Sequence, residues 1–146
     1  MLDPAQKIIE LIEEQWRDEN LTNAKKTRIH FTAAKTIVKP EKPYRVEAHR
    51  ISGRITRLSG KLPLKRDVIQ IDVFVKPSLN TPQAIKQALI DRWEIEKEVE
   101  RIIEENRTKI DQILFLEERS TTHRDELEQE PITLHTVIEV DATYAD

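Results

Sequence analysis

The amino-acid sequence predicts an α+β fold, with a mostly antiparallel sheet of about five strands covered by one long helix and preceded by an N-terminal helix. Three observations predict it. Two segments carry apolar residues at three-to-four spacing, the period of an amphipathic helix. Several other segments alternate apolar and polar residues, as half-buried strands do. The order along the chain is helix, three strands, long helix, two strands.

Both predicted helices begin with a capping residue followed by proline. The first follows Asp3-Pro4 and continues as "AQKIIELIEEQWR", and the second follows Thr81-Pro82 and extends to about residue 107. We expect the buried stripe of the long helix to consist of Ile85, Ala88, Leu89, Val99, Ile102 and Ile103.

The strands are predicted at residues 27–38, 44–51, 67–76, 112–118 and 132–140. The clearest is "DVIQIDVFVK" at 67–76. One of its faces is wholly aliphatic, and the other combines Val68 and Phe74 with polar groups. Because both faces carry apolar side chains, this strand should be central in the sheet.

Length and composition indicate one domain spanning residues 1–146. The chain has no cysteine, which excludes disulfides, thiolate metal sites and cysteine nucleophiles. The N-terminus mixes acids into its apolar positions, so it does not read as a secretion signal. No apolar run approaches the roughly 20 residues needed to cross a bilayer, and we expect no membrane association.

Charge is separated along the chain. Residues 25–66 hold thirteen Lys or Arg and two Glu, whereas residues 117–146 hold nine acids and two Arg. The stretch "SGRITRLSGKLPLKR" (52–66) contains both glycines, five basic residues and no acid. We expect it to form a flexible basic arm between two strands, with leucines that another protein would cover.

No residue pattern indicates catalysis, a cofactor or a metal. His30, His49, His123 and His135 lie on separate predicted elements, so we interpret them as solvent-facing strand or loop residues. "HRDEL" at 123–127 lacks a nucleophile in a constrained turn and reads as a solvated acidic loop. "GRITRLSG" matches neither a phosphate-binding loop nor a dinucleotide fingerprint. We therefore expect a protein that is not an enzyme and that binds no cofactor.

Two binding roles stay open for the basic region 25–66. Clustered Lys and Arg favour nucleic acid, so a DNA-binding accessory or regulatory protein is one interpretation. However, the 52–66 segment has no aromatic residue on which a base could stack. It also has no sustained amphipathic helix for a membrane surface. Two interpretations of this segment remain, a contact with another protein chain and a long surface loop without a partner.

The layout is an N-terminal amphipathic helix, three strands with a long connection between the second and the third, a covering helix and two further strands. This layout resembles the tail terminator proteins of long-tailed viruses and the related tail-completion and neck proteins. The resemblance rests on "PAQKIIELIEEQW", on "DVIQIDVFVKPSLNTPQAIKQALIDRW" and on "RDELEQEPITLHTVIEV". It covers nearly the whole chain as a pattern, without a diagnostic motif.

The resemblance implies a virion structural protein, assembled in the host cytoplasm, that forms a ring at the head-proximal end of the tail. In that family the ring is usually a hexamer. It implies contacts with the tail-tube protein and with a head-completion or neck protein, close to viral DNA. A head-to-tail ring needs two complementary patches on each subunit. We expect these patches to comprise Arg54, Arg57, Leu58, Lys61, Leu62, Leu64, Lys65 and Arg66 on one side and Asp125, Glu126, Glu128 and Glu130 on the other.

Overall fold

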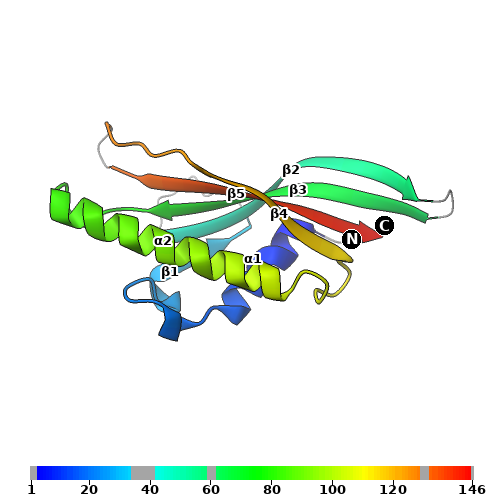
Figure 1. The fold of residues 1–146 in the computed structure, drawn as a ribbon, viewed down its shortest axis with the longest axis horizontal. Coiled ribbons are helices and arrows are strands. Elements are labelled where there is room, and N and C mark those ends of the chain that lie inside the picture. Colours follow the sequence, from blue (N-terminus) through cyan, green and yellow to red (C-terminus); the bar gives the residue numbers. More distant parts are fainter. Residues whose placement is uncertain (1–2, 34–41, 59–61, 129–131, 146) are drawn as a thin grey trace.

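The structure is a computed structural model and describes residues 3–33, 42–58, 62–128 and 132–145, with the backbone alone for residues 54–58 and 62–63. The predicted α+β fold class is confirmed (Figure 1). The elements are α1 (Pro4–Gln15), β1 (Ile29–Thr32), β2 (Tyr44–Leu58), β3 (Leu62–Val75), α2 (Pro82–Glu105), β4 (Phe115–His123) and β5 (Leu134–Ala145), with short 3-10 turns at Asp18–Asn20 and Lys26–Arg28.

Both helices begin at side-chain caps that satisfy backbone N–H groups of the first turn. The Asp3 carboxylate accepts from the backbone N–H of Ala5 at 3.1 Å and more weakly from that of Gln6 at 3.4 Å. The Thr81 hydroxyl accepts from the backbone N–H of Ala84 at 3.2 Å. Because proline follows each cap, the missing N–H of its ring removes no helical hydrogen bond.

The strands of the described chain form one mixed sheet in the order β1-β2-β3-β5-β4. β1 runs parallel to β2 and pairs with Tyr44–Glu47, while every other neighbouring pair is antiparallel. β3 is central, as the apolar groups on both its faces predicted. It pairs with β2 along one side and with β5 along the other.

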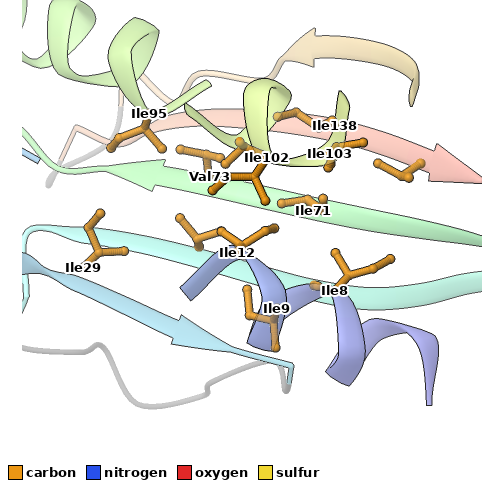
Figure 2. Close-up of a cluster of buried hydrophobic side chains, with 14 of the residues drawn as sticks. Ile8, Ile9, Ile12, Ile29, Ile71, Val73, Ile95, Ile102, Ile103 and Ile138 are labelled. Atoms are coloured by element: carbon orange, nitrogen blue, oxygen red, sulfur yellow. The ribbon is translucent and has the colours of Figure 1, made fainter. Parts of the chain in front are cut away.

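α1 and α2 pack on the same face of this sheet and enclose the core (Figure 2). The sheet contributes aliphatic side chains from alternate positions, among them Ile71 and Val73 of β3 and Ile138 of β5. Ile8 and Ile12 of α1 pack over one half, and α2 covers the other. The sequence predicted one covering helix, but the N-terminal helix shares that role.

The buried stripe of α2 differs from the prediction at three positions, and the first of these is Ile85, which is only partly buried. Leu89 is 41% exposed, whereas Ile95, which the prediction omitted, is fully buried. The stripe runs through Ala88, Ile95, Val99 and Ile102. Since successive helical residues are turned by about 100°, Leu89 points away from the sheet when Ala88 points into it.

Residues 52–58 and 62–66 are strand, which corrects the predicted irregular arm. They continue β2 and β3 as a paired hairpin that extends past both helices, with residues 59–61 outside the described chain (Figure 1). The many charged residues in this stretch mask its alternation of apolar and polar residues, so the sequence pattern did not predict a strand here. The expected flexibility of the segment stays a prediction.

Other strand boundaries shift by several residues. The strand predicted at 112–118 begins only at Phe115, because Gln112 has a left-handed backbone with φ of 69°. Polar residues 119–123, expected in a loop, belong to β4 at the border of the sheet. The strand predicted at 27–38 is observed at Ile29–Thr32, and residues 34–38 lie outside the described chain.

Candidate interaction surface on the open face of the sheet

No helix of the described chain covers the face of the sheet opposite α1 and α2, which we call the open face. Strand alternation directs a second set of side chains onto it, and most of these are polar. Glu47, Asp72 and Asp141 lie there and are nevertheless buried, because long neighbouring side chains cover them. Ionisable groups shielded from water in this way concentrate in two adjacent places.

The first place, which we call the His–Asp cluster, spans β2, β3 and β5 around a hollow of about 250 Å³. Its centre is the carboxylate of Asp72. His135 Nε2 donates to Asp72 Oδ1 at 2.7 Å, and Gln70 Nε2 donates to the same oxygen at 2.8 Å. His49 Nδ1 lies 3.3 Å from Asp72 Oδ2. One carboxylate on the central strand therefore joins side chains from both neighbouring strands.

An aromatic stack closes one side of the His–Asp cluster. The rings of Phe74 and His135 are stacked with centroids 4.3 Å apart, and the guanidinium of Arg45 lies 4.1 Å from the Phe74 centroid. Arg45 Nε is also 3.1 Å from Glu47 Oε1. Since His135 and Arg45 occupy the two strands beside Phe74, the stack fixes the same register as the Asp72 contacts.

The surroundings of Asp72 favour its ionised form. Burial acts first and raises its pKa. The hydrogen bonds from His135 and Gln70, with the positive charge of His135 and His49, outweigh burial and hold the pKa of Asp72 below its ordinary 3.8. Asp72 is therefore a carboxylate at neutral pH.

The chemistry available to the His–Asp cluster is limited by its composition. A histidine oriented by a carboxylate acts as a general base when it also reaches a nucleophile. The residues that line the hollow are Arg45, Glu47, His49, Gln70, Asp72, Phe74 and His135, without a hydroxyl, thiol or amine. Across the described part of the chain, no group of three or more His, Cys, Asp or Glu has a metal-binding arrangement. The geometry is more consistent with a structural contact between neighbouring strands than with a catalytic site.

The second place, which we call the arginine pocket, lies closer to the hairpin end of the sheet. It is a hollow of about 350 Å³ lined by Ser52, Arg66, Val68, Arg119 and Asp141. Arg66 Nη2 donates to Asp141 Oδ2 at 2.7 Å. Arg119 Nε is 3.7 Å from Asp141 Oδ1, too far for a hydrogen bond. Two guanidinium groups thus flank one buried carboxylate.

Two β-bulges border the arginine pocket. Ile51 is an extra residue in β2, between Arg50 and Ser52, and Arg119 is an extra residue in β4, between Glu118 and Ser120. A bulge bends its strand and redirects a side chain. Here the second bulge directs Arg119 toward Asp141 and Glu139 on β5.

The predicted basic patch lies on the hairpin. Arg54, Arg57 and Leu58 belong to β2 and Leu62 to β3, but their side chains, like the whole of Lys61, lie outside the described parts of the structure. Leu64 and Lys65 are partly buried. Arg66 is exposed, and among the described side chains of this patch it is the one that lines the arginine pocket.

The predicted acidic patch divides into two kinds of residue. Asp125 bonds to Arg92 of α2 and accepts from the backbone N–H of His135 at 3.0 Å, so it is a structural group within the fold. Glu126 and Glu128 are exposed, and Glu130 lies outside the described residues. The interpretation of this stretch as a solvated loop is therefore wrong at Asp125.

The predicted solvent-facing histidines are mostly engaged. His49 and His135 belong to the His–Asp cluster with their side chains less than one-fifth exposed. His123 is half exposed, but its Nε2 lies 2.8 Å from Glu96 Oε1 of α2. His30 is partly buried on β1.

Sequence reasoning missed Arg119 and Asp141. The alternation of the last strand placed Ile138 and Val140 on the core face, so Glu139 and Asp141 could have been placed on the opposite face together. Nothing in the sequence marks the bulge at Arg119. The contact between Arg119 and Asp141 could therefore not be predicted from the sequence pattern.

Comparisons with known proteins give no indication of the function. No protein-family model matches the sequence, and no curated protein matches it either. In the described chain, no helix is both long and apolar enough to span a bilayer.

Proposed function

We propose that the chain is a structural protein of the virion of a tailed virus, which assembles into a ring, usually a hexamer in the family it resembles, at the head-proximal end of the tail. In this role it contacts the tail-tube protein on one side and a head-completion or neck protein on the other. The order of elements α1-β1-β2-β3-α2-β4-β5 is the order that the resemblance requires, although β2 and β3 pair as a hairpin up to Leu58 and Leu62 and do not have the long connection that the resemblance included.

The observation that carries the proposal is the distribution of charge over the fold. The basic hairpin extends past the helices at one end of the sheet (Figure 1). The exposed Glu126 and Glu128 follow β4, beyond the opposite end. Opposite charges at opposite ends of one subunit suit a head-to-tail contact between copies, which closes into a ring when the rotation permits.

The test is the mass of the purified protein over a range of concentrations, by light scattering after gel filtration. The proposal expects closed assemblies of several 17.1 kDa chains, visible as rings by electron microscopy. A monomer at every concentration, combined with salt-sensitive binding to DNA, would instead support the DNA-binding alternative suggested by residues 25–66.

A further inference from the structure

We infer that the arginine pocket of one copy receives the acidic segment (residues 126–128) of a second copy. The inference rests on the proposed ring and adds which surfaces meet. The pocket is concave and lies between two bulges on the open face, with Val68 as an apolar floor. Arg66 and Arg119 stand at its rim, each about half exposed.

An acceptor in the pocket that receives no hydrogen bond indicates what kind of group enters. The Asp141 side chain is 8% exposed, and its Oδ1 is buried without a hydrogen-bond donor among the described residues. A buried carboxylate oxygen without a donor destabilises the structure around it. An incoming chain that supplies an N–H would remove this deficit when Arg119 turns outward.

The two arginines require a second property of the same ligand. A guanidinium binds a carboxylate through paired charge-assisted hydrogen bonds. The ligand must therefore present carboxylates to Arg66 and Arg119 and a donor to Asp141. An acidic peptide does both, since its backbone carries N–H groups. A DNA backbone presents phosphate acceptors to the two arginines but offers no N–H donor to Asp141.

The acidic segment has the required form. Glu126 is held in an extended pairing with Thr133, and Glu126, Leu127 and Glu128 are all exposed. The backbone bends at Glu128, and both carboxylates are open to solvent. They are therefore accessible to the two arginines that flank Asp141 in a second copy.

One chain cannot make this contact with itself. The acidic segment lies beyond the end of the sheet where Val75 pairs with Leu134, and the pocket lies where Val68 pairs with Asp141. Seven residues along a strand separate these levels, a distance of about 23 Å. The contact must join different copies, each using two different surfaces.

The experiment uses two full-length variants that lack opposite halves of the contact. Arg119→Glu damages the pocket and keeps the acidic segment, whereas Glu126→Gln with Glu128→Gln removes the charge of the segment and keeps the pocket. We expect each variant alone to remain monomeric where the wild type assembles. A mixture of the two should form a one-to-one pair that grows no further. Arg119→Gln should weaken wild-type assembly on the order of tenfold.

The controls separate this inference from the ring itself. Lys109→Glu reverses an exposed charge elsewhere and should assemble normally. Thermal melting shows whether each variant is folded. If Arg119→Glu does not fold, Arg119→Gln replaces it in the mixing experiment. Rings from either variant alone, or a mixture that stays monomeric, overturn the inference while wild-type rings uphold the proposed function. Loss of binding to a short DNA duplex in Arg119→Glu, with assembly intact, would assign the pocket to phosphate instead. A wild type that never assembles overturns both.

Discussion

At the scale of single residues, Asp72 connects three strands through side chains that are distant in the sequence. His135, its closest partner, is 63 positions away. The strand pattern placed Asp72 on the face opposite the core, but the sequence held no sign of which residues would surround it. Pairing register decides that, and register arises from the packing of the whole sheet.

Replacing Asp72 with Asn should make stability less dependent on pH. Because its pKa is lowered in the folded protein, the carboxylate stabilises the fold above pH 3.8, and this contribution is lost as the pH falls through the folded-state pKa. We expect Asp72→Asn to reduce the free energy of unfolding by about 1.5–3 kcal/mol at neutral pH, with a smaller difference in acid. Urea unfolding at both pH values measures this. Asp111→Asn, at an exposed position, should behave as wild type in both.

Gly53 allows two charged side chains to meet where β2 pairs with β3. A Cβ at this position would lie 2.1 Å from Arg50 Nη2 and 2.6 Å from Asp67 Oδ1. Arg50 Nε and Asp67 Oδ1 are 3.3 Å apart, and Tyr144 donates to the same buried carboxylate at 2.7 Å. Any larger residue at 53 must displace this pair.

Gly53→Ala should therefore lower the free energy of unfolding by about 1–3 kcal/mol, the usual effect of crowding a packed site. The same substitution in an Arg50→Ala background should cost less, because the crowding guanidinium is gone. Denaturant titration of the four proteins gives the coupling between the positions. Equal costs in both backgrounds would mean that the Arg50 contact does not explain the glycine.

At the scale of elements, sequence patterns located both helices and the centre of the sheet well. Capping residues and apolar spacing marked α1 and α2, since these signals are local. Patterns failed where tertiary contacts decide. Leu89 was assigned inward although α2 turns it outward, and the charged hairpin was read as an arm although its backbone pairs as strand.

Val73→Asp should prevent folding. Val73 is fully buried on β3 beneath the helices, and a carboxylate there would have no compensating partner in an aliphatic core (Figure 2). The protein should lose its cooperative thermal transition or its solubility. Ile51→Asp is the matched control, because Ile51 is 44% exposed at a bulge, and it should melt like wild type. A soluble Val73→Asp protein that melts cooperatively would contradict the assignment of this face.

At the scale of the whole molecule, the near-neutral total charge conceals two ends of opposite sign. The separation of charge could be predicted directly, because it depends only on residue counts along the chain. The arginine pocket was not predictable in the same way. The pocket depends on the pairing register of three strands and on a bulge in a fourth strand, and no local sequence pattern predicts either feature.

Reversing two charges on the hairpin should weaken assembly and leave the fold unchanged. We expect the double variant Arg54→Glu, Arg57→Glu to shift the protein toward monomer, because the steering attraction between the ends becomes repulsion. Sedimentation velocity at low and physiological salt measures the shift, which should be larger at low salt. An unchanged sedimentation profile at both salt concentrations would remove the hairpin charge from the contact.

The short β1 strand has a consequence for solubility. Among the described residues, no strand pairs with the outer border of β2 beyond Glu47, and a border without a partner strand presents backbone donors and acceptors. Such a border is a template for aggregation, and proteins commonly protect it with charge. Arginines at positions 50, 54 and 57 supply like charges that keep two such borders apart. Concentrated salt screens that repulsion, since the Debye length falls from about 10 Å at 0.1 M to about 3 Å at 1 M. Turbidity should therefore rise with salt even as the native charge-dependent contacts weaken.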